Sequence, residues 1–395
     1  MVYVTSSKRR PIRVLAADDS ALMRSALLKT FSAQVGDGSQ HLPAMELCGV
    51  VRDGVEALQA VERLCPDVLL LDLAMPRLDG MGVLLQLRAK GLRLPVLLCT
   101  SCTEQGARET LEALSLGALD YVAKPARQSD IGGALELLRA EVLPRIAALV
   151  GPVRATNSAP AGSSSALLPS VHHPVEAVVI AASTGGPSAI ETVLRALPTT
   201  FAVPILIVQH MPRLFTSALA ARLDRVCTLS VHHAEESEVL RPGVVYLAPG
   251  DLHLEAAGRR TRSTVHLHRG EALHGCMPAA DYLFRSAARI FGAGTLAVVM
   301  TGMGNDGLEG SLAVRAAGGS VLAQDQATSA VWGMPGRVSE AGLAEAVLPL
   351  ERIAAALLER TLMKRTAAPV EALALHSHIN PAQAMRPLEA FRELL

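Results

Sequence analysis

Three polar residues that could form a catalytic set follow three apolar runs in the second half of this 395-residue chain. Ser183 lies in ASTGGP, His210 in VQHMP and Asp306 in TGMGNDG. A hydroxyl beside an imidazole that a carboxylate orients is the arrangement that activates a serine nucleophile. Any one of these residues has a commoner explanation, such as a helix cap for Ser183. Together, at three strand ends, they predict acyl-transfer chemistry.

The same region supports a rival interpretation. Gly302–Gly307 reads G-x-G-x-x-G after an apolar run, and Asp325 lies roughly 20 residues further on, where a ribose-binding acid is expected. This pattern would indicate a dinucleotide-dependent oxidoreductase. It occurs late in the chain and leaves the turns at Ser183 and His210 unexplained, and the residues alone leave both interpretations open.

A second polar group follows apolar runs in the first half of the chain. It comprises Asp18, Asp19, Asp72, Thr100 and Lys124. Three carboxylates make a hard oxygen site suited to Mg²⁺. Without a cation, crowding of like charges would disfavour their ionisation. A lysine and a hydroxyl opposite them suit the oxygens of a phosphoryl group.

Ligands bind at the carboxyl ends of parallel strands in open α/β sheets, so each polar group needs such a sheet beneath it. In the first half, five β-rich runs alternate with amphipathic stretches, which predicts an α/β doubly wound sheet. The expected helices between the strands include 21–31, 55–64, 81–90 and 108–116. The expected strands are 12–16, 45–51, 67–71, 95–99 and 119–122. A helix over 134–149 would close this domain, and the polar connection 34–43 is expected to be a surface insertion.

The second half repeats this alternation. Apolar runs at 177–181, 204–208 and 296–300 predict a second, mostly parallel sheet. The closely spaced runs at 244–248, 252–255 and 264–268 predict an antiparallel excursion. A Ser-, Pro- and Ala-rich stretch lacks apolar periodicity and is typical of a flexible linker. The expected organisation is a first domain over 1–150, a linker over 151–174, a second domain over 175–361 and a tail of unknown role over 362–395.

Composition narrows the function classes. The chain has 37 Lys+Arg and 37 Asp+Glu, so its net charge of zero argues against a nucleic-acid partner. No apolar run approaches the ~20 residues of a membrane span, and no secretory signal is evident. Six scattered cysteines, including Cys99 and Cys102, are interpreted as plain thiols, which favours a cytoplasmic protein. The pairs His232–His233 and His266-x-His268 could suggest a metal, but no nearby acid or cysteine completes a site with His266 and His268, so the histidines are interpreted as exposed polar positions.

Residues 12–125 resemble the receiver domain of two-component response regulators through ADDS, LLLDLAMPRLDG, CTS and AKP. The resemblance implies a flavodoxin-like fold in which Asp72 accepts a phosphoryl group from a histidine kinase. It also implies the residues around that group: Asp18 and Asp19 holding Mg²⁺ with Asp72, and Thr100 and Lys124 contacting the phosphoryl oxygens.

Residues 175–361 resemble the catalytic domain of chemotaxis protein-glutamate methylesterases, through AASTGGP, VQHMP, MTGMGNDG and QDQATSAVWGMP. The resemblance implies a Rossmann-like α/β esterase domain that needs no cofactor for ester hydrolysis. Its implied roles are Ser183 as nucleophile, His210 as general base and acid, Asp306 as orienting carboxylate, and the backbone N–H groups of Thr184 and Met303 as oxyanion hole.

The two resemblances together imply a phosphorylation-activated methylesterase that acts on the signalling helices of chemoreceptors. Some members of that family also deamidate glutamine there. We expect a monomer that meets membranes only through its receptors, and whose unphosphorylated receiver packs over the active site. Met277 and Ala279 stand where the family usually has Arg and Ser. This departure leaves open a scaffold with an inactive or redirected output domain.

Overall fold

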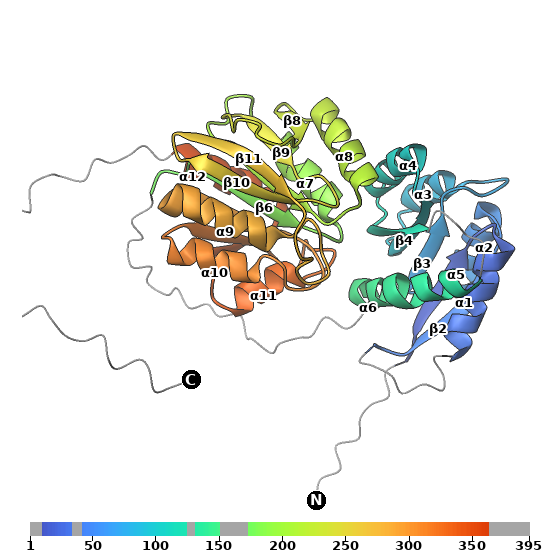
Figure 1. The fold of residues 1–395 in the computed structure, drawn as a ribbon. Coiled ribbons are helices and arrows are strands. Elements are labelled where there is room, and N and C mark those ends of the chain that lie inside the picture. Colours follow the sequence, from blue (N-terminus) through green and yellow to red (C-terminus); the bar gives the residue numbers. More distant parts are fainter. Residues whose placement is uncertain (1–9, 34–41, 125–130, 151–172, 363–395) are drawn as a thin grey trace, which may run out of the picture. The chain divides into compact units, whose positions relative to one another are not determined.

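The computed structural model describes residues 10–33, 42–124, 131–150 and 173–362 (Figure 1). The expected linker, the expected tail and the polar connection after residue 33 therefore lie almost wholly outside the described residues. Both sheets described below belong to one compact unit of the chain. None of the described helices is long and apolar enough to cross a membrane.

The N-terminal part, residues 10–150, contains a five-stranded parallel sheet in the order β2-β1-β3-β4-β5. Its strands are β1 (Ile12–Ala17), β2 (Met45–Val51), β3 (Val68–Asp72), β4 (Val96–Ser101) and β5 (Asp120–Lys124). Its helices are α1 (Ala21–Ala33), α2 (Gly54–Leu64), α3 (Gly80–Ala89), α4 (Glu104–Ser115), α5 (Ile131–Leu137) and α6 (Leu143–Val150), with a π-helical turn at Leu138–Val142.

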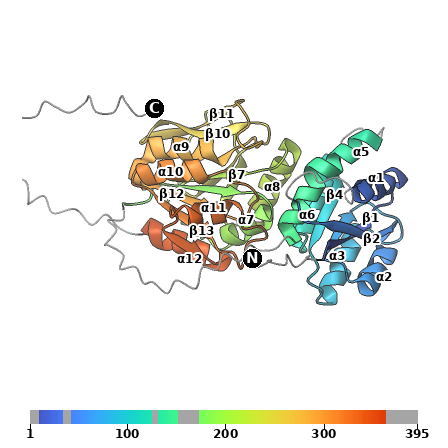
Figure 2. The same cartoon turned by 90° about the horizontal axis from the view of Figure 1, so that it is seen from below.

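Alternation along the strands buries both faces of this sheet. Leu15 and Leu69 face the layer of α2, α3 and α4, whereas Val14 and Leu70 face the layer of α1 and α5. Figure 2 shows α1 and α5 on one side of the sheet and α2 and α3 on the other. The doubly wound sheet predicted from the sequence is therefore confirmed, and each strand starts within one residue of its predicted start.

Two helices differ from the sequence prediction for local reasons. α4 begins at Glu104, ahead of the predicted Arg108, because the Thr103 side chain accepts a hydrogen bond from the Gly106 N–H and caps the helix there. The predicted closing helix over 134–149 is interrupted at Leu138 by the π-helical turn.

The C-terminal part, residues 173–362, contains a seven-stranded parallel sheet in the order β14-β13-β12-β6-β7-β9-β8. Its strands are β6 (Ala177–Ala182), β7 (Ile205–Gln209), β8 (Ser230–His233), β9 (Val244–Leu247), β12 (Thr295–Val299), β13 (Ser320–Gln324) and β14 (Ala346–Leu348). Its helices are α7 (Gly186–Arg195), α8 (Arg213–Val226), α9 (Ala280–Phe291), α10 (Leu308–Ala316), α11 (Met334–Glu340) and α12 (Leu350–Leu362).

This sheet is also covered on both faces. Val178 and Ile180 of β6 pack in the same cluster as residues of α7, α8 and α12. Ala177 and Val179 point the other way, into a cluster formed with α9. A two-stranded antiparallel ribbon, β10 (His253–Arg259) with β11 (Arg262–His268), packs against α9 on that second face (Figure 1).

One strand of the predicted antiparallel excursion was placed wrongly. The run at 244–248 forms β9, which pairs parallel with both β7 and β8 inside the main sheet. Only the runs at 252–255 and 264–268 form the antiparallel ribbon. A run of four strand residues carries no signal for the direction of its partners, even of β8, which precedes it closely in the sequence.

The order of the central strands is what matters for the site. β6 lies between β12 and β7, and all three run parallel. Residues that follow these three strands therefore meet at one edge of the sheet, where open α/β sheets bind their ligands.

Candidate functional sites

Ser183 follows β6 directly, in a tight turn before α7. Its backbone N–H donates to the Thr301 carbonyl, and the Gln209 side chain donates to the Ser183 carbonyl at 2.9 Å. Gly302 is required beside it, since a Cβ there would lie 2.8 Å from the Cβ of Ser183 and 2.5 Å from the sulfur of Met334. The turn is thus fixed from both neighbouring strands, and Ser183 itself remains partly exposed.

His210 follows β7, and Asp306 lies between β12 and α10. Nε2 of His210 is 2.7 Å from Oδ2 of Asp306. The Asp306 carboxylate is 1% exposed, and it also accepts hydrogen bonds from the backbone N–H groups of Ala280, Asp281 and Gly307. Every lone pair of this buried carboxylate is used, so the imidazole is held in one orientation.

The hydrogen bonds determine the charges of this pair. Burial lowers the pKa of His210, but the hydrogen bonds to Asp306 and to Cys276 outweigh burial and raise that pKa to about 10. Burial raises the pKa of Asp306, but His210 and the backbone donors bring it below its usual value. Near neutral pH the pair is therefore an imidazolium facing a carboxylate.

The second nitrogen of His210 faces a residue that sequence reasoning missed. Nδ1 lies 3.5 Å from Sγ of Cys276, in the segment between β11 and α9. The Ser183 hydroxyl makes no hydrogen bond with any described residue. The sequence did single out this segment, because Met277 and Ala279 depart from the family pattern, but Cys276 itself was not recognised.

Two backbone N–H groups that the resemblance assigns to an oxyanion hole have no acceptor among the described residues. Neither the Thr184 N–H nor the Met303 N–H donates to a described residue. The Thr184 carbonyl accepts a hydrogen bond from the Thr301 hydroxyl at 2.9 Å, which fixes the peptide plane after Thr184. These are the two groups that the sequence predicted for an oxyanion hole.

His274, Asp281 and Asp306 place potential metal-ligand atoms within 4.8 Å of one another. The Asp281 side chain already accepts hydrogen bonds from the Gly310 N–H at 2.6 Å and from Nε2 of His274 at 3.3 Å. Because the Asp306 oxygens are also fully engaged, a cation here would have to displace hydrogen bonds that hold the His210–Asp306 pair. The cluster is therefore better explained as a hydrogen-bonded support that holds the His210–Asp306 pair in place.

The histidine pairs elsewhere in this domain have acidic partners that the sequence did not indicate. His266 contacts Glu236 and His268 contacts Glu255, each at 3.2 Å. These glutamates lie 30 and 13 residues away along the chain.

The N-terminal part brings together the second polar group. Potential ligand atoms of Asp18, Asp19 and Asp72 lie within 4.8 Å of one another. Nζ of Lys124 is 2.6 Å from Oδ2 of Asp72 and 2.9 Å from Oδ2 of Asp18. The three carboxylates follow β1 and end β3, and Lys124 ends β5, so this group also lies at the carboxyl edge of its sheet. The donor set fits Mg²⁺, which prefers carboxylate oxygens.

Burial dominates the charge of Asp72. It raises the pKa of Asp72 to about 6, with a further increase from the neighbouring Asp18 and an opposing effect of Lys124. Thr100, near the end of β4, is turned toward α4, where its hydroxyl lies 2.9 Å from the hydroxyl of Thr110. Of the five predicted residues, Lys124, Asp72 and Asp18 are joined by ion pairs, whereas Asp19 and Thr100 make no hydrogen bond to the others in the group.

The two sites define a class of protein: a receiver-type phosphoacceptor domain joined to an α/β domain with a hydrolase-like Ser, His and Asp arrangement. Comparison with known proteins identifies both halves. Residues 14–136 match the response regulator receiver domain, and residues 178–357 match the CheB methylesterase family.

Similar curated proteins extend over most of the chain. A protein-glutamate methylesterase/protein-glutamine glutaminase of Nocardioides sp. is 44% identical over 367 residues, which are 90% of this chain and 96% of that protein. One of the same name from Pyrococcus abyssi is 39% identical over 350 residues, 87% of this chain and 92% of its own. The crystal structure of the Thermotoga maritima CheB methylesterase catalytic domain is 42% identical, with a TM-score of 0.46, over 47% of this chain and 99% of that one. This chain belongs to the CheB methylesterase family.

The charge state of His210 generates a prediction about stability. A histidine whose folded pKa exceeds its unfolded value of about 6.5 stabilises the fold fully below that pH, and this contribution is lost as the pH rises through the folded value. Asp306 stays charged in this range because its pKa is low. The stability advantage of the wild type over Asp306→Asn should therefore be largest near pH 6 and should shrink as the pH approaches about 10. Urea denaturation across this range measures it; a difference independent of pH would contradict the pairing.

Proposed function

We propose that this chain is a serine-type protein-glutamate methylesterase whose reaction is gated by phosphorylation of its receiver domain. The observation that carries the proposal is the His210–Asp306 pair at the edge where Ser183 follows the adjoining strand β6. The relatives are named for the same ester hydrolysis and for glutamine hydrolysis, and we extend both to this chain as its reaction class.

In this mechanism the Ser183 hydroxyl attacks the carbonyl carbon of a glutamyl methyl ester. His210 accepts the hydroxyl proton through Nδ1, since Nε2 is bound to Asp306. The N–H groups of Thr184 and Met303 stabilise the oxyanion that develops. His210 then returns the proton to the departing methanol, and water resolves the acyl-enzyme by the same path in reverse.

The described arrangement is a resting one. The raised pKa of His210 keeps the ring protonated near neutral pH, so it cannot accept a proton until its surroundings change. The imidazolium has Asp306 on one nitrogen and Cys276 on the other. Catalysis requires the neutral ring to face Ser183 instead.

The receiver part of the proposal rests on the acidic group. Asp18, Asp19 and Asp72 would hold Mg²⁺, which offsets negative charge on the carboxylates and on a transferred phosphoryl group. Asp72 would accept the phosphoryl group from a histidine kinase. Lys124 is already positioned to contact its oxygens, and Thr100 would have to leave Thr110 to reach them.

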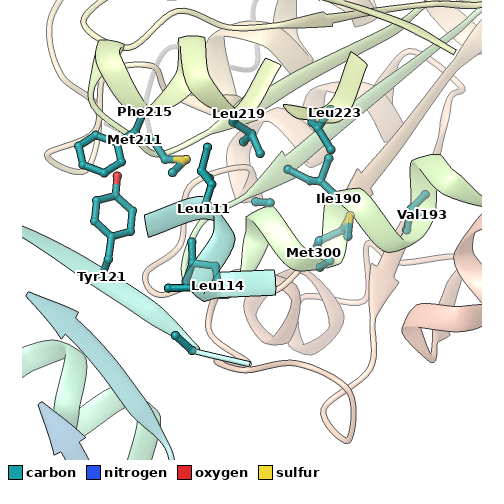
Figure 3. Close-up of a cluster of buried hydrophobic side chains, with 14 of the residues drawn as sticks. Leu111, Leu114, Tyr121, Ile190, Val193, Met211, Phe215, Leu219, Leu223 and Met300 are labelled. Carbon is teal, nitrogen blue, oxygen red and sulfur yellow. The ribbon is translucent and has the colours of Figure 1, made fainter. Parts of the chain in front are cut away.

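Contacts between the two domains support gating. The Thr184 hydroxyl donates to Oδ2 of Asp120, on β5 of the receiver domain, at 2.8 Å. Nearby, the rings of Tyr121 and Phe215 stack with centroids 4.5 Å apart. Figure 3 shows these rings beside Leu111 and Leu114 from the receiver domain, facing Leu219 and Ile190 from the esterase domain. The receiver domain thus holds the residue that follows the nucleophile.

The partners follow from the reaction class. We propose the signalling helices of chemoreceptors as substrate and a histidine kinase as phosphodonor, with the protein acting as a monomer in the cytoplasm. The six cysteines are all free, in keeping with a reducing compartment.

The rival oxidoreductase interpretation needs Asp325 as a ribose-binding acid. The Asp325 carboxylate instead accepts hydrogen bonds from the N–H and hydroxyl of Thr328 in its own turn. The scaffold alternative has Met277 as its only sequence support.

Ser183→Ala is expected to lower methanol release from methylated chemoreceptor by on the order of 10⁴-fold or more, because the nucleophile of a catalytic set is removed. Methanol release with and without a small phosphodonor measures the effect. The variant should unfold at the same urea concentration as the wild type and should still be phosphorylated. Release at the wild-type rate would refute the nucleophile.

Asp72→Asn is expected to abolish the increase in methanol release that a small phosphodonor produces in the presence of Mg²⁺, since no carboxylate remains to accept the phosphoryl group. The rate with donor is divided by the same variant's rate without it. Asp67→Asn is a matched control, because this carboxylate also adjoins β3 but pairs with Arg10 outside the acidic group. A preserved increase in Asp72→Asn would contradict phosphorylation gating at this residue.

Asp120→Ala is expected to raise the rate of the unphosphorylated protein by about 10-fold, because a hydrogen bond to a charged group contributes about 1.5–3 kcal/mol. Its partner Thr184 would be released from the receiver domain. Glu141→Ala is the control: Glu141 is the other carboxylate that pairs with Arg145, and it makes no contact with Thr184. Equal rates for Asp120→Ala and the wild type would rule out this contact as a restraint.

A further inference from the structure

The Cys276 thiol contacts His210, whose other ring nitrogen contacts Asp306. Its sulfur is 3.5 Å from Nδ1 of His210, and Nε2 of the same ring is 2.7 Å from Asp306. A carboxylate, an imidazole and a thiol in this sequence have the arrangement that activates a cysteine as a nucleophile. This thiol is therefore part of a built cluster.

The segment that carries Cys276 gives reagents access to the sulfur. The Cys276 N–H donates to the Leu273 carbonyl at 2.8 Å, which forms a tight turn ahead of α9. His274 and Gly275 within the turn are exposed, and Cys276 is half-buried. The remaining five cysteines differ: all are described, and none has an imidazole as hydrogen-bond partner. Cys99 is fully buried, and burial raises its pKa to about 12.

We propose that Cys276 is a site of reversible oxidation by hydroperoxides, and that its oxidation stops the esterase reaction by occupying the nitrogen of His210 that Ser183 needs. The second half of this statement rests on the proposed serine mechanism. The first half does not, since it concerns only the reactivity of the thiol beside the imidazole.

The oxidation uses the Cys276 thiol, the His210 imidazolium, solvent water and the hydroperoxide. Because His210 is already an imidazolium near neutral pH, the thiol proton passes to solvent water, and the thiolate beside the imidazolium attacks one oxygen of the hydroperoxide. The S–O bond forms as the O–O bond breaks, so the sulfur loses two electrons and the peroxide gains them. The departing alkoxide or hydroxide takes up a proton from the imidazolium and leaves as alcohol or water. Cys276 is left as a sulfenic acid, which thiol reductants return to the thiol.

The position of the product explains the expected inhibition. Nε2 of His210 is committed to Asp306, so Nδ1 is the remaining nitrogen that can accept the Ser183 proton. A sulfenic acid oxygen adds a heavy atom to a sulfur that already contacts this nitrogen. It would hold the ring against the turn at residues 273–276 and away from Ser183. After Asp306, Cys276 is a further group that raises the pKa of His210.

The experiment treats the full-length protein with hydrogen peroxide, then measures methanol release from methylated receptor in the presence of phosphodonor. Each rate is divided by the same variant's untreated rate. Fully oxidised wild type should lose at least about 100-fold in rate, which is the usual contribution of a general base, and dithiothreitol should restore the rate. Peptide mass spectrometry with a sulfenic-acid probe locates the oxidised residue.

Cys276→Ser and Cys276→Ala should keep their own untreated rates after peroxide. Cys65→Ser is the matched control, because Cys65 is an exposed thiol of the receiver domain and its loss should leave the wild-type sensitivity intact. Equal loss of rate in the wild type and in both Cys276 variants would overturn the proposal, as would full activity of protein shown to be oxidised at Cys276. Failure of the serine mechanism appears separately, as methanol release by untreated Ser183→Ala. Untreated Cys276 variants that are folded but inactive would make Cys276 the nucleophile and would overturn the inhibitory role proposed here.

Discussion

The buried carboxylate of Asp306 is the constraint on which the proposed active site depends. A charge with 1% of its surface exposed can persist only when its oxygens are fully bonded, because burying an unpaired charge is costly. The donors that meet this need come from three places in the fold: the loop after β7, the start of α9 and the start of α10. The electrostatic requirement of one side chain therefore fixes the relative positions of three elements and the orientation of His210.

Asp72 shows how the same residue type can serve another purpose. Both carboxylates lie at the carboxyl edge of a parallel sheet and both are buried. Asp306 meets an imidazole and three N–H groups, and its pKa falls below the usual value. Asp72 has one lysine, which it shares with Asp18, and its pKa rises to about 6. Asp306 keeps its negative charge because its bonding partners compensate it, whereas the carboxylates around Asp72 carry more negative charge than Lys124 can compensate. An excess of that kind is what a divalent cation relieves.

The sequence predicted the parts of the molecule that depend on local chemistry. Apolar strands and capped helices have period and cap signals, so the two doubly wound sheets and the residues after β6, β7 and β12 could be predicted. The direction of β9 could not, because its partners β7 and β8 are chosen by packing across the sheet. The contact of Cys276 with His210 is of the same kind: 66 residues separate them, and a turn between the ribbon and α9 brings them together.

These constraints meet in the turn that carries Ser183, the proposed nucleophile. Ser183 is fixed through its own backbone by Thr301 and Gln209, so its position depends on the sheet and hardly on its own side chain. Thr184, one residue later, directs its hydroxyl to the receiver domain and its carbonyl to Thr301. A shift of the receiver domain would therefore act first on the peptide of Thr184, whose N–H has no acceptor among the described residues. In the proposed mechanism a domain contact alters oxyanion binding without moving His210 or Asp306, since neither of these residues makes a hydrogen bond to a described residue of the receiver domain. The proposed regulation and the proposed proton transfer therefore use different residues at the same edge of the sheet.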